Sequence, residues 1–373
     1  MTDRPILLAA GGTGGHMFPA EATAQALLAK GQPVALVTDA RGQAFDALPD
    51  VPVHRVSAAS PAGGLWSKAK AAVLLARGAG QASRLIKQLD PAAIVGFGSY
   101  ASIPALYAAA GAKVPMLLHE QNAHLGRANR LMADRASVIA TGFPGVDGLK
   151  PTVRAPVIMT GNPVRQPFLA HRGAAYSPPT NTQPIRLLIL GGSQGARILS
   201  DLVPDALTGL PDEVQARIKL TQQVRPEDHD RVRAAYAGSP IEADLARFFT
   251  DVPDRLAAAH LVIARSGAST VAELTCIGRP SILIPYPHAT DDHQTLNAQA
   301  LETAGSALLA PQSTLTVERL RNLIGHLLMD VGRLSWMAGN AADFAPIDAA
   351  DRVADLAIAL ANGQAINVTG AAD

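Results

Sequence analysis

Two glycine-rich turns, each between a strand-like and a helical segment, constrain this sequence more than any other feature. The apolar run at residues 6–10 leads into Gly-Gly-Thr-Gly-Gly at 11–15, and the run at 187–190 leads into Gly-Gly-Ser-Gln-Gly at 191–195. Glycine lets the backbone turn tightly beside a ligand, and the following helix N-terminus offers N–H groups to an anion. The repetition predicts two similar halves, with both turns facing one ligand cleft.

Strand-like and helical segments alternate in both halves, which indicates parallel sheets with helices on both faces. In the first half we expect strands at residues 6–10, 34–38, 93–97, 116–119 and 138–141 and helices at 21–29 and 66–88. In the second half we expect strands at 187–190, 262–265 and 281–285 and helices at 197–208, 269–277 and 295–304. The predicted fold class is α/β, with two doubly wound, Rossmann-like domains.

A segment rich in Gly, Pro, Ser, Thr and Asn begins near residue 160 and indicates a domain boundary. A length of 373 residues accommodates two domains. We expect an N-terminal domain at 1–162, a C-terminal domain at 163–335, and an alanine-rich helical tail at 336–373 that packs back on the first domain.

Composition excludes several classes of function. A net charge of +1 and an aromatic content of 4% argue against nucleic-acid binding through bulk charge or base stacking. Cys276 is the one cysteine of the sequence, so an internal disulfide and a multi-cysteine metal site are both excluded. No apolar run reaches the roughly 20 residues that a membrane span requires, and no signal peptide is evident. We expect a cytoplasmic protein, which would contact a membrane only from its cytoplasmic side.

Polar side chains follow the strand-like segments of the first half, at the edge where doubly wound sheets bind ligands. His16 directly follows the first glycine turn, where an imidazole could accept a proton from a hydroxyl group. Glu120 and Asn122 follow the strand expected at 116–119, and Glu120 is a second candidate base. The residues alone leave the choice between His16 and Glu120 open.

The second half carries a further strand-to-helix segment, from Arg265 to Glu273, whose helix N-terminus suits a phosphate group. Glu273 is placed to accept hydrogen bonds from two sugar hydroxyls, or else it forms a capping box with Thr270. The histidines and aspartates at 288–293 raise the question of a metal site, but their spacing matches no zinc motif. We predict no metal and no cofactor, and Gln294 is a candidate for sugar hydroxyls.

These motifs, in this order, resemble those of the MurG family of peptidoglycan glycosyltransferases. The matching segments are GGTGGH at 11–16, HEQN at 119–122, GNPVR at 161–165, GGSQGAR at 191–197, RSGASTVAE at 265–273 and HQ at 293–294. The resemblance covers nearly the whole chain. It implies a two-domain GT-B fold that transfers N-acetylglucosamine from UDP-N-acetylglucosamine (UDP-GlcNAc) to the lipid-linked muramyl-pentapeptide lipid I, which gives lipid II.

The resemblance also implies roles for individual residues. His16 and Glu120 would lie near the acceptor as the catalytic pair. Substrate-binding roles would fall to Thr13, Gly14, Gly15, Asn122, Arg165, Ser193, Thr250, Ala268, Ser269, Thr270, Glu273 and Gln294. The transfer would be inverting and metal-independent, with the muramyl 4-hydroxyl attacking the anomeric carbon as UDP leaves. Ser99 and His293 depart from the family pattern, and no role is assigned to them.

The family further implies peripheral docking on the cytoplasmic face of the cell membrane. The segment from Leu65 to Arg77, continuing to Lys87, mixes apolar and basic residues at helical spacing. An amphipathic basic helix of this kind lies on anionic lipid surfaces. The same pattern fits an ordinary helix that packs on a core and exposes its lysines to water.

Other functions fit parts of the sequence. Another GT-B nucleotide-sugar transferase would share the frame but take a different acceptor, and a UDP-GlcNAc 2-epimerase would use the same donor with no acceptor. A dinucleotide-dependent oxidoreductase fits the glycine turns, although the G-x-G-x-x-G pattern is absent. A non-catalytic nucleotide-sugar sensor would differ from these enzymes only in its lack of turnover.

Overall fold

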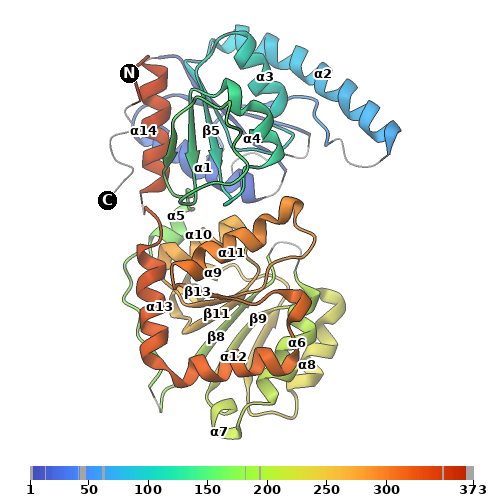
Figure 1. Ribbon diagram of the computed structural model, residues 1–373, viewed down its shortest axis with the longest axis vertical. Coiled ribbons are helices and arrows are strands. Elements are labelled where there is room, and N and C mark those ends of the chain that lie inside the picture. The colour runs from blue at the N-terminus through green and yellow to red at the C-terminus, as the bar shows by residue number, and fades with distance from the viewer. Residues whose placement is uncertain are drawn as a thin grey trace. The chain divides into compact units, whose positions relative to one another are not determined.

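The computed structural model describes residues 3–12, 14–40, 42, 48–60, 64–180, 182–192, 195–346 and 348–366. The chain divides into two compact units (Figure 1). The first unit holds the residues up to Arg165 together with those from Pro346 onward, and the second unit is Gln166–Ala345. The first unit is therefore built from two separate stretches of the sequence.

The first unit is built on a parallel sheet with the strand order β3-β2-β1-β4-β5-β6-β7. Its strands are β1 (Ile6–Ala9), β2 (Val34–Thr38), β3 (Val53–Arg55), β4 (Ala93–Gly96), β5 (Met116–Glu120), β6 (Val138–Thr141) and β7 (Val157–Met159). Its α-helices are α1 (Gly14–Ala29), α2 (Leu65–Leu89), α3 (Ile103–Gly111), α4 (Arg127–Met132) and α14 (Ala349–Ala361). All side chains of β1 and β4 are buried, because helices cover both faces of such a sheet.

Each face of this sheet has its own apolar core. On one face Leu27 of α1 packs together with Val353 and Leu360 of α14. On the other face Ile86 of α2 and Leu106 of α3 belong to one cluster with the strands. The last helix of the chain thus completes the core of the first unit, although the whole second unit precedes it in the sequence.

The second unit repeats the same plan with the strand order β10-β9-β8-β11-β12-β13. Its strands are β8 (Ile185–Leu190), β9 (Ile218–Gln223), β10 (Glu242–Ala246), β11 (Leu261–Ala264), β12 (Ser281–Leu283) and β13 (Ala307–Leu309). Its α-helices are α5 (Gln166–Leu169), α6 (Arg197–Thr208), α7 (Asp212–Gln215), α8 (His229–Tyr236), α9 (Val252–Ala258), α10 (Ala268–Ile277), α11 (His293–Thr303), α12 (Val317–Met329) and α13 (Val331–Asp343). The strand order reverses between β1 and β4 and between β8 and β11, and such switch points bind ligands. The predicted doubly wound α/β fold is confirmed in both units.

The predicted helical tail is split into two helices that belong to different units. Pro346 lies between α13 and α14, and proline interrupts a helix because it lacks the backbone N–H. α13 packs on α10, where a Cβ on Gly278 would lie 3.0 Å from the Cβ of Ala342. Residues 336–345 therefore stay with the second unit, and the return to the first unit begins at Pro346 rather than at residue 336.

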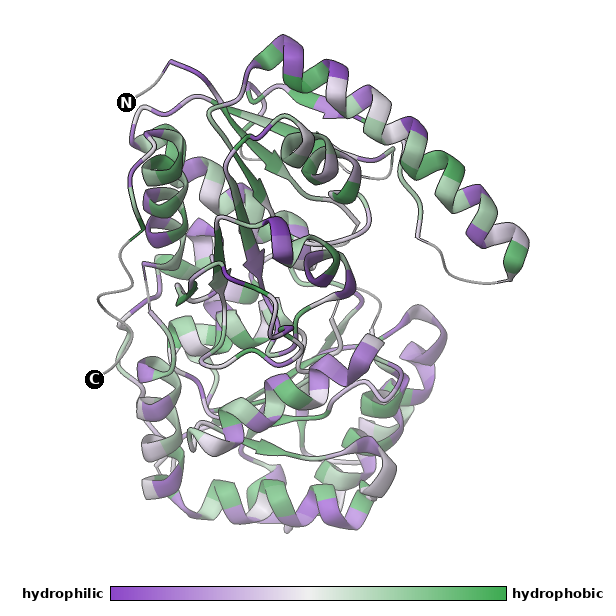
Figure 2. Ribbon diagram, turned by 45° about the horizontal axis from the view of Figure 1, so that its top comes forward, coloured by the Kyte–Doolittle hydropathy of each residue, from purple (hydrophilic) through white to green (hydrophobic). Residues whose placement is uncertain are grey.

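α2 is the longest described helix of the first unit, and it packs on the unit from Ala71 onward but not at its start. Gly78, Ala82 and Ile86 are buried, whereas Leu65 and Trp66 at its start are 85% and 90% exposed. Figure 2 shows apolar and hydrophilic residues alternating along this helix. Of the helices in the described ranges, none is long and apolar enough to cross a membrane.

Candidate active site

The carboxyl ends of β1, β4 and β5 meet at one edge of the first sheet, and the first glycine turn leaves the sheet there. A Cβ on Gly11 would lie 2.5 Å from the Cβ of Ala101, so only glycine fits this close approach. The turn leads into α1, whose first residues are Gly14 and Gly15. Thr13 and Ser193 lie outside the described residues.

His16 stands in the first turn of α1, with its ring held at Nδ1. Nδ1 lies 2.8 Å from the carbonyl oxygen of Phe97 and 3.1 Å from Oε1 of Gln121. A carbonyl oxygen only accepts hydrogen bonds, so Nδ1 carries the proton and donates it. In the neutral ring Nε2 then keeps its lone pair, and it makes no hydrogen bond to any residue in the described ranges. This arrangement suits a group that accepts a proton from a substrate hydroxyl.

Glu120, the other candidate base, has both carboxylate oxygens occupied. Oε1 accepts hydrogen bonds from the backbone N–H of Asn122 at 3.1 Å and from its Nδ2 at 3.2 Å. Oε2 accepts from the N–H of Gly126 at 2.9 Å and from Nδ2 of Asn129 at 2.8 Å. The side chain is 2% exposed. These contacts suit a carboxylate that holds the loop after β5 in shape.

Replacing Glu120 with glutamine should therefore reduce stability. The amide would turn an NH₂ group toward two N–H donors, and a buried group that loses its partner costs about 1–3 kcal/mol. We expect urea denaturation to show a free energy of unfolding about 2 kcal/mol lower than in the wild type. Asp50→Asn, an exposed carboxylate of the same unit, should change it by less than about 0.5 kcal/mol. Equal stability of both variants would contradict a structural role for Glu120.

Three further polar residues at this edge are buried and paired with one another. His119 and Gln121 belong to the HEQN segment that was expected at the ligand-binding edge, and Asn129 is a residue that sequence reasoning missed. His119, Gln121 and Asn129 are each at most 1% exposed. Asn129 donates from Nδ2 to the carbonyl oxygen of His119 at 3.1 Å as well as to Glu120. Burial lowers the pKa of His119 to about 4, so its ring is neutral at physiological pH. The polar cluster after β5 is thus an internal network rather than a row of separate ligand contacts.

Arg165 belongs to the first unit and lies beside the start of α1. Its guanidinium carbon is 3.9 Å from the centroid of the Phe18 ring, a cation–π contact. A Cβ on Gly14 would lie 2.6 Å from the same ring, so the glycine makes room for it. The structure thus brings Arg165 to the glycine turn from a position far along the sequence.

The corresponding edge of the second sheet carries the other glycine turn. Gly191 donates its N–H to Oε1 of Gln223 at 3.0 Å, and Nε2 of Gln223 donates to the carbonyl oxygens of Gly192 and Arg247, both at 3.1 Å. Gln223, which sequence reasoning missed, therefore ties the turn to the loop after β10. Thr250 lies in that loop and is exposed.

The N-terminus of α10 lies at the end of β11 on the same edge. Gly267 is the N-cap residue and provides no side-chain cap, and Ala268, Ser269 and Thr270 form the first turn. The capping box of Thr270 and Glu273 is therefore wrong, because Thr270 lies inside the helix. The hydroxyl of Ser269 is buried and has no hydrogen-bond partner in the described part of the chain. Helix N–H groups and an unpaired hydroxyl together suit an anionic ligand.

Gln294 closes this edge from the start of α11. Its Oε1 accepts the N–H of Tyr286 at 2.9 Å, and its backbone carbonyl accepts the hydroxyl of Ser266 at 2.8 Å. Its Nε2 makes no hydrogen bond within the described ranges and remains a donor for a ligand. The neighbouring His293 contacts Thr290 through Nδ1, 2.7 Å from the carbonyl oxygen.

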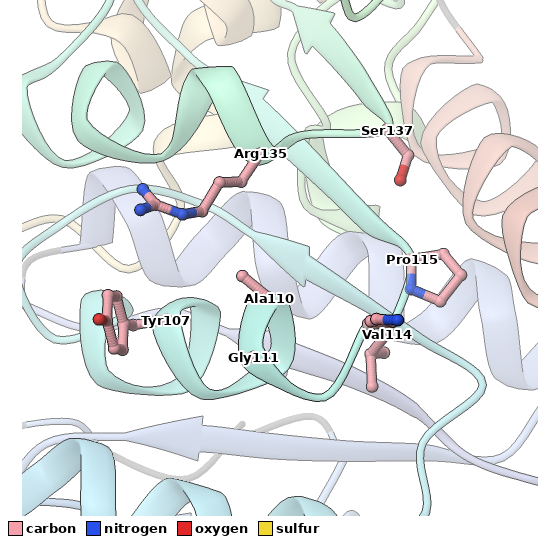
Figure 3. Close-up of a pocket in the computed structure, with 8 residues that line it drawn as sticks. Tyr107, Ala110, Gly111, Val114, Pro115, Arg135 and Ser137 are labelled. Carbon is pink, nitrogen blue, oxygen red and sulfur yellow. The ribbon is translucent and has the colours of Figure 1, made fainter.

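A pocket of about 490 Å³ lies at the opposite end of the first sheet (Figure 3). Pro115 and Ser137, which precede β5 and β6, line it together with Tyr107 and Arg135. The guanidinium of Arg135 lies over the Tyr107 ring at 5.8 Å. This pocket is separate from the site around His16, which lies at the carboxyl ends of the strands. Among the residues that the structure describes, no group of three or more His, Cys, Asp or Glu side chains could hold a metal ion.

Comparison with known proteins relates both units to one family. Residues 6–141 match the N-terminal domain of glycosyltransferase family 28, and residues 186–353 match its C-terminal domain. The chain is 51% identical to a protein of Rhodospirillum centenum over 98% of this chain and 97% of that one, and 50% identical to one of Paramagnetospirillum magneticum over 96% and 98%. Both relatives are named UDP-N-acetylglucosamine–N-acetylmuramyl-(pentapeptide) pyrophosphoryl-undecaprenol N-acetylglucosamine transferase.

Solved structures agree with these sequence matches. The crystal structure of Acinetobacter baumannii MurG is 30% identical and superposes with a TM-score of 0.76 over 95% of this chain and 99% of that one. The kitacinnamycin glycosyltransferase, at 16% identity and a TM-score of 0.69 over 96% of this chain and 100% of that one, shows the same fold. The two Rossmann-like units are those of a GT-B glycosyltransferase. The chain belongs to glycosyltransferase family 28, and its relatives there are MurG enzymes.

Proposed function

We propose that this chain transfers N-acetylglucosamine from UDP-GlcNAc to the 4-hydroxyl of the muramyl sugar of lipid I, which forms lipid II and UDP. The names of its relatives supply the donor and the acceptor. The observation that carries the chemistry is the ring of His16, held at Nδ1 with Nε2 left as an acceptor beside the first glycine turn. Such a group is what attack by a sugar hydroxyl requires.

His16 is the base of this reaction, and Glu120 is a positioning residue. Nε2 of His16 takes the proton of the muramyl 4-hydroxyl while its oxygen forms a bond to the anomeric carbon. The bond from that carbon to the diphosphate oxygen breaks on the opposite side, and UDP leaves with the electron pair. The configuration at the anomeric carbon is therefore inverted. Glu120 keeps the loop after β5 in shape through its four hydrogen bonds.

The donor binds mainly to the second unit. The N-terminus of α10 stabilises the negative charge that develops on the diphosphate, and the family resemblance also assigns the positive charge of Arg165 to the donor. Glu273 accepts hydrogen bonds from the ribose hydroxyls, and Nε2 of Gln294 donates to a sugar hydroxyl. These groups stabilise the leaving diphosphate in place of a divalent cation, so the transfer proceeds without a metal ion.

The decisive experiment measures UDP release from UDP-GlcNAc, with and without a short-chain lipid I analogue, in the presence of EDTA. We expect release that depends on the acceptor and survives the chelator. Release without an acceptor would favour an epimerase-like or hydrolytic enzyme. Loss of release in EDTA that Mg²⁺ restores would contradict the metal-independent mechanism.

The start of α2 is the surface that meets the membrane. Leu65 and Trp66 are exposed apolar side chains, and Lys68 and Lys70 next to them are exposed cations. Apolar residues insert at the headgroup boundary, while each nearby lysine adds about 1 kcal/mol on anionic lipid. This combination supports peripheral docking on the cytoplasmic face of the membrane, where lipid I is reached.

Trp66→Glu should weaken binding to vesicles that contain anionic phospholipid by about tenfold or more, because burying a large apolar side chain contributes about 1.5–3 kcal/mol. Vesicle co-sedimentation measures this partition. Met329→Glu is the matched control, since Met329 is 83% exposed but lies on α12 of the second unit. Equal loss in both variants, or no loss in Trp66→Glu, would contradict docking through α2. Activity on a water-soluble acceptor should stay the same.

A further inference from the structure

A chain of hydrogen bonds runs behind His16 through two buried side chains. Nε2 of His119 lies 3.2 Å from the carbonyl oxygen of Gly161, and Nδ1 of the same ring lies 2.9 Å from Nε2 of Gln121. Oε1 of Gln121 then lies 3.1 Å from Nδ1 of His16. The chain therefore links the end of β7 to the first turn of α1 across the edge of the sheet.

The direction of every hydrogen bond in this chain is determined by carbonyl oxygens, which only accept. Gly161 accepts from His119, so Nε2 of His119 is protonated and Nδ1 is an acceptor. Nε2 of Gln121 donates to the carbonyl oxygen of His119 at 3.0 Å, which identifies the NH₂ end of the amide. Oε1 of Gln121 must then face His16. The proton on Nδ1 of His16 is shared between two acceptors, this Oε1 and the carbonyl oxygen of Phe97.

We propose that Gln121, oriented by neutral His119, is a positioning residue that stabilises the protonated form of His16 during the transfer. When Nε2 takes the proton of the hydroxyl, the ring becomes an imidazolium, and the two acceptors at Nδ1 share its charge. Hydrogen bonds to charged groups are stronger than those to neutral ones, and a chain of them strengthens each member. Burial keeps the pKa of His119 low, so its ring stays neutral and does not repel the imidazolium.

This inference rests on the proposed role of His16, and kinetics test it in the full-length protein. Gln121→Met keeps the volume but removes the acceptor and both donors. We expect kcat to fall by about ten- to a hundredfold, because a hydrogen bond to a charged group is lost. KM for both substrates should stay within about twofold of the wild type, since a group that acts in the transition state changes kcat. Ser102→Ala, which removes a buried hydroxyl bound to Ser99 in the same unit, should leave both constants unchanged.

Nitrogen NMR of ¹⁵N-histidine-labelled protein provides a test that needs no activity. The wild type should show His16 protonated at Nδ1 and His119 protonated at Nε2, and the resonance of His16 Nδ1 should shift in Gln121→Met. The opposite tautomer at either ring would overturn the chain, even if the variant failed to fold. An unchanged kcat in folded Gln121→Met would overturn the role of Gln121. Absence of acceptor-dependent UDP release in the wild type would instead refute the proposed function, and the NMR result would still stand.

Discussion

Replacing His16 with alanine is expected to lower kcat by about 10²–10⁴-fold, the usual contribution of a general base. The ring is held at Nδ1 by Phe97 and Gln121, so Nε2 is the atom that is lost from the reaction. The affinity for UDP-GlcNAc should change little, because the groups proposed to bind the donor lie mainly on α10 and α11. Steady-state kinetics with a lipid I analogue and binding of UDP by calorimetry separate these two effects.

The matched control is His54→Ala, which removes a histidine on β3 at the far edge of the same sheet. We expect kcat of this variant to stay within about twofold of the wild type, as for surface changes away from a site. Glu120→Gln should retain far more activity per folded molecule than His16→Ala. If His16→Ala kept most of its kcat and folded Glu120→Gln lost it, Glu120 would be the base and the present assignment would be wrong.

The second large effect is expected at the donor site. Glu273→Ala should raise KM for UDP-GlcNAc by about a hundredfold or more and weaken UDP binding equally. Two ribose hydroxyls would lose a charged acceptor worth about 1.5–3 kcal/mol each, and 1.4 kcal/mol corresponds to a factor of ten. The lost interaction is made in the ground state as well as in the transition state, so kcat at saturation should fall only a few-fold.

2′-Deoxy-UDP, which lacks one of the two ribose hydroxyls, tests the same contact from the ligand side. The wild type should bind 2′-deoxy-UDP more weakly than UDP, whereas Glu273→Ala should bind the two alike, because the partner of the hydroxyl is gone. Glu318→Ala removes an exposed carboxylate from α12 of the same unit and should change neither affinity. A preference for ribose that persisted in Glu273→Ala would place the ribose elsewhere.

Most central strands of both sheets follow from the sequence because their signals are local, but β9, an inner strand of the second sheet, was not expected. The strand expected at 138–141 is β6, and the helix expected at 197–208 is α6. Strands at the sheet edges escaped prediction: β3 has three residues and none is buried, and β10 reads Glu-Ala-Asp-Leu-Ala. Such strands are defined by pairing with a neighbour rather than by an apolar run.

The candidate site likewise has a part that the sequence predicted and a part that it did not. The glycine turns were predicted, but Gln223 and Asn129, which hold the loops in place, were not. Each is an ordinary amide in the sequence and gains its role only when the sheet brings it to backbone groups far along the chain. Ser99 adopts a positive φ of 66°. Glycine adopts this conformation more readily, so a glycine would fit this position of the turn with less strain.

The position of α14 has a consequence for how the protein is made. Residues 166–345 form one continuous stretch of the chain, so the core of the second unit needs no segment made later. The first unit emerges earlier but lacks α14, so the sheet face that receives Val353 and Leu360 stays uncovered until residues 349–361 have been made. Domains usually fold in the order of their synthesis, and an exposed apolar face invites aggregation. Here the unit translated first is the last to finish folding, and a chain that stops after residue 345 leaves the sheet face beneath α14 unprotected.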